Sequence, residues 1–294
     1  MQLAPGMTTY ALTGATGSLG RLAVSALLDR GVPAADVIAV VRDPAKAADL
    51  AARGVQVRTA DYEDRAALEA ALGGVDRLLF VSGSEAGRRA EQHRNVVAAA
   101  QAAGVRRIAY TSIANADRNS TPLAVEHRLT EELLHESGIQ AVLLRNSWYL
   151  ENYTAQLPQY RAAGAIVGAA GGGRVSAAPR AEYAEAAVAA LLEDDSATYE
   201  LGGPAFTMAE LAATLGEVTG TDLAYRNLPP EEFRAGLLVT GLDEGTADFV
   251  TALELATAGD ELDVPVTDLE RLLGRPALDL RTALALLLGR ASRD

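Results

Sequence analysis

A glycine-rich segment near the start of the chain is the first whose residue types and spacing could bind a ligand. Residues 13–20 read TGATGSLG, a G-x-x-G-x-x-G pattern between a β-rich run and a helical stretch. In such a turn Gly14 permits the sharp bend, Gly17 lets the backbone approach a diphosphate, and Gly20 allows the helix to pack closely on the strand. Free N–H groups at the start of the helix then bind phosphate oxygens. The segment predicts a dinucleotide site, to which we assign Gly14, Ala15, Thr16, Gly17, Ser18 and Leu19; the alternative is a glycine-rich turn without a function.

The residues after the second predicted strand indicate which dinucleotide this is. At this point a carboxylate ordinarily accepts hydrogen bonds from the adenosine ribose and repels a 2′-phosphate. The chain instead has Arg42, whose planar guanidinium suits a phosphate, and Lys46 one helical turn further on. We therefore predict NADPH as the cofactor. The alternative is that Arg42 and Lys46 are solvated surface charges and that Asp43 faces the ribose.

Two further strand ends add polar or small residues to the predicted site. Asp61 and Tyr62 follow the third strand, where the adenine amino group needs an acceptor, although Asp61 could equally cap the next helix. Ser82, Gly83 and Ser84 follow the fourth strand, where small residues let the chain pass close to the nicotinamide ribose. The same segment could serve as the N-cap of the following helix, and the two roles are compatible.

Three residues that could hold a substrate follow the sixth predicted strand. Asn146, Trp148 and Tyr149 lie at its carboxyl end, the edge at which doubly wound sheets bind their ligands. An amide, a phenol and the single Trp of the chain would suit a flat aromatic substrate over the nicotinamide. The alternative for Trp148 is a place in the hydrophobic core.

The elements that must position these residues alternate between short β-rich runs and helical stretches from Thr8 to Arg145. Such an alternation requires a parallel sheet with helices on both faces. The six predicted strands are Thr8–Thr13, Val37–Val41, Gln56–Thr59, Leu78–Val81, Ile108–Thr111 and Ala141–Leu144. The helices between them are predicted near Leu19–Arg30, Ala45–Arg53, Arg65–Leu72, Arg88–Ala103 and Ala124–Ser137.

The regularity weakens after Arg145, where a helix over Arg180–Leu192, a short strand over Tyr199–Leu201 and several short helices are predicted. The predicted fold class is therefore α/β, a doubly wound parallel sheet of the Rossmann type with a smaller composite C-terminal α+β lobe. We expect an NADP-binding domain over residues 7–150 and a smaller substrate-side lobe over residues 151–294, with some segments returning to the sheet.

The composition is that of an ordinary globular protein and excludes several functions. The 294 residues are 49% hydrophobic and 22% charged, with a net charge of −13 that leaves no basic face for nucleic acid or an anionic membrane. No run of 18 apolar residues and no signal peptide is expected. Without cysteine the chain forms no disulfide, and without a cluster of His and carboxylates at ligand spacing we expect no metal. A reducing cytoplasm fits best, and a homo-oligomer is left open.

Several motifs together resemble those of one known group. They are the segments 13–20, 41–46, 60–62, 84–95, 109–112, 144–153, 181–184 and 199–211. On these motifs the chain resembles the NmrA-like, atypical branch of the short-chain dehydrogenase/reductase superfamily, and it is similar to the bacterial type 2 NADPH:quinone oxidoreductases from about Thr8 to the last helix. The resemblance implies a cytoplasmic NADPH-dependent reductase that passes hydride to quinones, and we add Thr111 to the cofactor residues within it.

The chain departs from standard members of that superfamily in the helix after the fifth strand. Those proteins use Tyr-x-x-x-Lys, in which the Tyr protonates the substrate oxygen, whereas residues 124–131 here read AVEHRLTE. A quinone requires less, because its reduction yields an aromatic hydroquinone and a hydrogen-bond donor or water suffices. His127 could donate that hydrogen bond with Glu131 orienting it, and the alternative is a solvated pair on a helix face. We place His93 and His135 on helical surfaces without a function.

These observations predict an NADPH-dependent reductase that transfers hydride to quinones or quinone-like aromatic compounds. One alternative is a non-catalytic NADP(H)-binding redox sensor, which the missing Tyr and Lys would fit. Another is a reductase of other electrophiles, such as enones or azo compounds. The presence of Asn146, Trp148 and Tyr149 favours an enzyme.

Overall fold

A seven-stranded sheet is the central element of the computed structural model, which describes residues 8–85 and 87–291. The strands of this sheet are β1 (Tyr10–Thr13), β2 (Val37–Val41), β3 (Gln56–Thr59), β4 (Arg77–Phe80), β5 (Arg107–Ile113), β6 (Gln140–Asn146) and β9 (Thr198–Leu201). Their order is β3-β2-β1-β4-β5-β6-β9. The pairs β1–β2, β1–β4, β2–β3 and β4–β5 are parallel. The predicted Rossmann-like α/β fold is confirmed.

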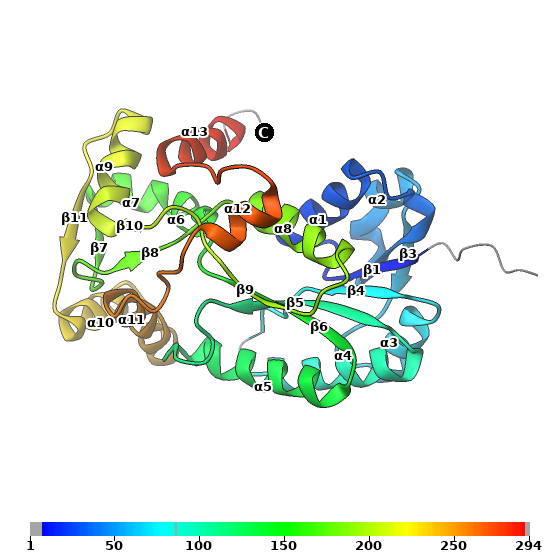
Figure 1. Cartoon of the computed structure of the whole chain (residues 1–294). Helices are drawn as coiled ribbons and strands as arrows, with labels where there is room; N and C mark the ends of the chain where they lie inside the picture. The colour runs from blue at the N-terminus through cyan, green and yellow to red at the C-terminus, as the bar shows by residue number, and fades with distance from the viewer. Residues whose placement is uncertain (1–7, 86, 292–294) are drawn as a thin grey trace, which may run out of the picture. The chain divides into compact units, whose positions relative to one another are not determined.

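Helices connect these strands because apolar residues recur with helical spacing between the β-rich runs. In the first half of the chain the helices are α1 (Ser18–Asp29), η1 (Ala34–Asp36), η2 (Pro44–Ala47), α2 (Ala48–Ala52), α3 (Arg65–Leu72), α4 (Arg89–Ala103) and α5 (Pro122–Ser137). All five residues of β2 are buried, as expected for a strand that is covered on both faces. Helices α3, α4 and α5 lie on one face of the sheet, and α1 and α8 (Arg180–Leu192) lie on the other (Figure 1).

The chain forms two compact units, each with discontinuous residue ranges. Unit 1 comprises the residues up to Ser112, then Glu126–Leu144 and Tyr183–Tyr199; unit 2 comprises Ile113–Val125, Arg145–Glu182 and the residues from Glu200 onward. Each has its own hydrophobic core. In unit 1, Leu68, Phe80 and Tyr110 belong to one cluster of buried side chains. In unit 2, Tyr153, Phe206 and Leu211 belong to another.

Unit 2 contains two pairs of short strands that the sequence did not predict, together with the several helices that were expected after Arg145. Its strands pair as β10 (Phe206–Thr207) with β8 (Arg174–Val175), antiparallel, and β11 (Ala224–Asn227) with β7 (Ala165–Gly168), parallel. Its helices include α6 (Leu150–Thr154), α7 (Leu157–Ala163), α9 (Met208–Thr219), α10 (Pro230–Val239), α11 (Glu244–Ala258), α12 (Thr267–Leu273) and α13 (Leu280–Ala291).

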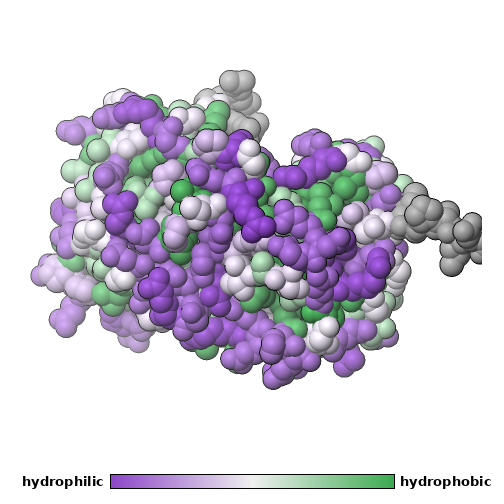
Figure 2. Space-filling model, viewed as in Figure 1, coloured by the Kyte–Doolittle hydropathy of each residue, from purple (hydrophilic) through white to green (hydrophobic). Residues whose placement is uncertain are grey.

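The surface agrees with the composition. On the face shown in Figure 2, hydrophilic residues predominate and hydrophobic residues occur in small groups. Within the described ranges, no helix combines the length and the apolar character needed to cross a membrane.

Candidate cofactor and active site

The glycine-rich turn between β1 and α1 has the backbone that the sequence predicts. Gly14 has a φ of +59°, a backbone conformation that residues other than glycine rarely adopt. A Cβ at Gly20 would lie 2.2 Å from the carbonyl oxygen of Gly14, so α1 can approach the turn only with glycine at this position. Gly17 is the N-cap of α1 and provides no side-chain cap. The first-turn N–H groups of α1 therefore face the cavity described next without a capping side chain.

A cavity of about 480 Å³ lies at the carboxyl ends of β1, β2, β3 and β4. Of the predicted cofactor residues, those that line it are Gly14, Thr16, Gly17, Ser18, Leu19, Arg42, Lys46, Asp61, Tyr62, Ser82, Gly83 and Ser84. The cavity is also lined by residues that were not predicted to bind the cofactor, namely Gly20, Val40, Val41, Asp43, Ala60, Val81, Glu85 and Gln92. Ala15 and Thr111 are buried and do not line the cavity, but Thr111 Oγ1 accepts a hydrogen bond from the N–H of the lining residue Ser82 at 2.8 Å.

Charged side chains meet at the β2 end of this cavity. Arg42 Nη1 donates to Glu85 Oε1 at 2.9 Å, and the Arg42 side chain is 65% exposed. Lys46 is exposed as well. Asp43 lines the cavity, but its Oδ1 also accepts from the Ala45 N–H at 3.0 Å and so caps η2.

The residues predicted to bind the cofactor after β3 and β4 also form contacts within the protein. Asp61 Oδ1 accepts from the Glu63 N–H, whereas Asp64 is the residue that caps α3, so the alternative of a helix cap at Asp61 is wrong. The Tyr62 hydroxyl donates to the Val81 carbonyl at 2.7 Å, and burial raises the pKa of that phenol. The segment after β4 supplies no side-chain cap to α4, whose N-cap is Arg88.

His93 lies in the core of unit 1, and its prediction as a surface residue is wrong. The side chain is fully buried, with the rings of Phe80 and Tyr110 at 4.7 and 5.7 Å between centroids. Its Nε2 accepts from the Gly83 N–H at 3.0 Å, and its Nδ1 lies 2.8 Å from Thr130 Oγ1. The polar run around it in the sequence indicated a solvated helix face and gave no signal of burial; Arg89, one turn earlier on the same helix, is buried too.

His127 is buried as well, which excludes the solvated pair considered as an alternative for it. Its Nδ1 lies 2.7 Å from the Tyr110 hydroxyl, and burial lowers the pKa of His127 to about 3, so the ring is neutral near pH 7. Glu131 Oε1 accepts from Ser112 Oγ at 2.6 Å. The Tyr110 hydroxyl and His127 Nδ1 share one hydrogen bond, in which the tautomer of His127 decides which group donates.

The predicted substrate residues belong to unit 2. Trp148 is half-buried and packs against the core of that unit, and Tyr149 has the Arg180 guanidinium 4.7 Å above its ring centroid. The Asn146 amide nitrogen lies 3.4 Å from the Tyr149 hydroxyl, while Asn146 Oδ1 is buried without a hydrogen-bond partner among the described residues. A buried acceptor without a partner is costly, so Asn146 has hydrogen-bonding capacity that its protein neighbours leave unused.

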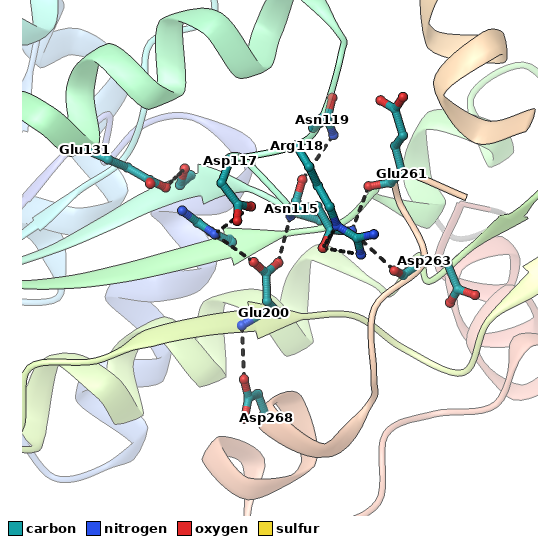
Figure 3. Close-up of polar contacts among 12 residues, drawn as sticks. Asn115, Asp117, Arg118, Asn119, Glu131, Glu200, Glu261, Asp263 and Asp268 are labelled. Carbon is teal, nitrogen blue, oxygen red and sulfur yellow. Dashed lines mark hydrogen bonds and ion pairs between the residues drawn. The ribbon is translucent and has the colours of Figure 1, made fainter. Parts of the chain in front are cut away.

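A polar cluster in unit 2 fixes the turn that follows β5 (Figure 3). Asn115 has a φ of +51°, its N–H donates to Glu200 Oε2 at 2.8 Å, and its amide donates to the Glu261 carbonyl at 2.9 Å. Arg145 bridges Glu200 and Asp117. No group of three or more potential ligands that could hold a metal is present within the described ranges.

Comparison with known proteins agrees with this geometry. The family model described as NAD(P)H-binding matches residues 14–194, which include the glycine-rich turn and every segment of the cavity. The chain belongs to the NAD(P)H-binding family.

Relatives of this NAD(P)H-binding protein include a quinone oxidoreductase and a triphenylmethane reductase. It is 46% identical to quinone oxidoreductase 2 of Escherichia coli over 92% of this chain and 95% of that protein. A crystal structure of the NADPH-dependent quinone oxidoreductase QOR2 from Escherichia coli with NADPH has a TM-score of 0.91 and 44% identity, covering 95% and 100% of the two chains. The triphenylmethane reductase of Citrobacter sp. with NADP(H) has a TM-score of 0.87 and 37% identity, covering 94% and 99%. The predicted resemblance to NADPH:quinone oxidoreductases is confirmed.

The residues present in the cavity fit the cofactor of the family. The turn that would bind the diphosphate requires glycine at two positions. Gly14 has a positive φ, and a Cβ at Gly20 would collide with the backbone of Gly14. The first turn of α1 supplies N–H donors for a diphosphate, and Arg42 and Lys46 supply positive charge for a further phosphate.

Proposed function

We propose that this NAD(P)H-binding protein is an NADPH-dependent reductase that transfers hydride to quinones or quinone-like aromatic compounds. The observation that carries the proposal is the 46% identity to quinone oxidoreductase 2 across nearly the whole of both chains. The half-exposed Trp148 beside an amide and a phenol supports an aromatic substrate. The absence of cysteine supports a cytoplasmic location, and the net charge of −13 opposes nucleic acid as a partner.

Each site residue has a proposed role. The bound cofactor supplies the hydride. The first turn of α1 binds the diphosphate, and Arg42 with Lys46 binds the 2′-phosphate. Asn146 and Tyr149 bind the oxygens of the substrate, and Trp148 stacks on its ring. His127, which burial keeps neutral, donates a hydrogen bond from Nε2 to the substrate rather than acting as a charged acid.

NADPH consumption measured against a panel of quinones tests this function. Equal concentrations of aldehydes, ketones, enones and azo compounds serve as the comparison. Turnover of quinones far above that of aldehydes and ketones is expected. If NADPH binds but no quinone, enone or azo compound is reduced, the protein is a redox sensor and the proposal is wrong.

A further inference from the structure

Residues 82–85, the segment after β4, line the cofactor cavity. Two side chains of α4 form hydrogen bonds with the backbone of this segment. His93 Nε2 accepts from the Gly83 N–H at 3.0 Å, and Arg89 Nε donates to the Gly83 carbonyl at 2.8 Å. These residues are four apart on α4 and therefore project from one face of the helix. Both polar backbone atoms at Gly83 thus have partners on the protein side.

The histidine is fixed in one protonation state by its partners. A backbone N–H can only donate, so His93 Nε2 is an acceptor and the ring proton lies on Nδ1. That proton points to Thr130 Oγ1 at 2.8 Å, and Thr130 in turn donates to the Glu126 carbonyl at 2.9 Å. Burial lowers the pKa of His93 to about 2, so the acceptor persists across the physiological pH range.

The arginine is fixed by a buried ion pair. Arg89 Nη1 lies 3.1 Å from Glu126 Oε2, and their side chains are 6% and 14% exposed. The other oxygen of Glu126 accepts from the Gly87 N–H at 2.9 Å. Gly83 is therefore bound to α4 by the neutral His93 ring and by a charge-assisted bond from Arg89, and Gly87 is bound to α5 by an exposed bond to Glu126.

The same segment supplies four lining residues to the cofactor cavity, namely Ser82, Gly83, Ser84 and Glu85. We propose that His93 is a positioning residue for NADPH, which acts through the Gly83 N–H to hold this wall of the cavity in its binding conformation. The inference rests on the proposed function only for the place of the cofactor, and it concerns binding rather than turnover.

Replacing His93 with an apolar ring tests whether it positions the Gly83 N–H or only packs in the core. His93→Phe keeps the ring contacts with Phe80 and Tyr110 but leaves the Gly83 N–H buried without an acceptor, so the peptide must turn away from its native orientation. His93→Gln retains an acceptor at nearly the same reach. Leu134→Ala is the matched control, because it opens a cavity in the same core without touching the segment.

The experiment is a titration of each folded variant with NADPH, together with thermal unfolding. We expect His93→Phe to weaken NADPH binding by about 10-fold or more. His93→Gln should restore most of the affinity, and Leu134→Ala should lower the melting temperature while binding stays native. Native affinity in His93→Phe, or equal weakening in His93→Phe and Leu134→Ala, would overturn the proposal.

A measurement on the native protein keeps the test open if His93→Phe does not fold. The Gly83 amide proton should exchange slowly with solvent in NMR spectra, because it is donated to a buried ring nitrogen. Rapid exchange of that amide would overturn the proposal. Failure of the proposed function appears differently, since a native protein that binds NADPH without reducing quinones leaves the binding result for His93 intact.

Discussion

Arg42 Nη1 donates to Glu85 Oε1 at 2.9 Å and so joins the segments that follow β2 and β4, the two strands that flank β1 in the sheet. Both side chains line the cofactor cavity. Exposed ion pairs of this kind are weak, and the Arg42 side chain is 65% exposed. A phosphate can therefore compete with Glu85 for the guanidinium.

Replacing Arg42 should remove the preference for NADPH over NADH. One or two charge-assisted hydrogen bonds to the 2′-phosphate are worth roughly 1.5–3 kcal/mol each, so Arg42→Ala should weaken NADPH binding by about 10-fold or more and leave NADH binding nearly unchanged. Calorimetric titration with both dinucleotides measures this.

Two variants serve as controls for that titration. Arg53→Ala removes an exposed arginine that bonds Ser25 outside the cavity, and it should change neither affinity. Glu85→Gln removes the competing carboxylate and should increase the preference for NADPH. The assignment of Arg42 is wrong if the native protein binds NADH as tightly as NADPH.

Gly17→Val should abolish cofactor binding while the fold survives. A Cβ at Gly17 meets only the Gly14 carbonyl oxygen, at 3.2 Å, so the chain can accommodate it with a small shift. The branched side chain then occupies the space that the diphosphate needs. Circular dichroism and NADPH titration on one sample test this, with Gly172→Val as the control because a Cβ there meets nothing within 4 Å. Native affinity in a folded Gly17→Val variant would show that the dinucleotide binds elsewhere.

The glycine-rich turn and the first six strands could be predicted from the sequence because their signals are local. Gly14, Gly17 and Gly20 have fixed spacing, and the apolar runs between helices have a strand's length. The predicted helix over Arg65–Leu72 and strand over Gln56–Thr59 match α3 and β3 at both ends. Strand β4 begins one residue earlier and β6 extends two residues further than predicted.

The parts that could not be predicted depend on contacts between distant segments. Strand β7 pairs with β11, where Ala165 is the partner of Ala224, and strands of four residues carry too little pattern for such pairing to be inferred. His93 lies in the polar run AEQHRN, whose composition is that of a surface helix. Only the fold brings Gly83 against this helix and makes a buried acceptor necessary.

Stability should fall as the pH is lowered toward 4, because His127 is buried in its neutral form. Burial lowers its pKa from 6.5 to about 3. Between these values the unfolded chain binds a proton that the folded chain does not, so the free energy of unfolding decreases with falling pH by about 1.4 kcal/mol per unit for this group. Urea unfolding of the native protein and His127→Gln over about pH 4.5–6.5 measures the difference in slope.

The free energy of unfolding should change less steeply with pH in His127→Gln than in the native protein. The expected difference is about one bound proton, or about 1.4 kcal/mol per pH unit. His135→Gln, at an exposed histidine of the same helix, controls for the substitution itself. Equal slopes for His127→Gln and the native protein would mean that His127 is accessible to protons in the folded state.

Turnover should depend more on stacking than on a proton donor. The proposed substrate residues include a half-exposed Trp148, whereas His127 is neutral and presents at most an uncharged N–H. Trp148→Ala should therefore raise the KM for a quinone, since it removes binding shared by ground and transition states. His127→Ala should lower kcat by no more than the roughly 10²–10⁴-fold of general acid catalysis.

Steady-state kinetics with one good quinone, and an NADPH titration of each variant, test this last prediction. NADPH affinity should stay nearly native in both variants, because neither side chain lines the cofactor cavity. Tyr110→Phe adds a further arm: it removes the hydroxyl 2.7 Å from His127 Nδ1 and frees the ring to place its proton on either nitrogen. If His127 donates through Nε2, Tyr110→Phe should lower kcat in the same direction as His127→Ala and leave the KM unchanged. Loss of all turnover in His127→Ala with a native KM in Trp148→Ala would instead identify a dedicated acid as the group that drives the reaction.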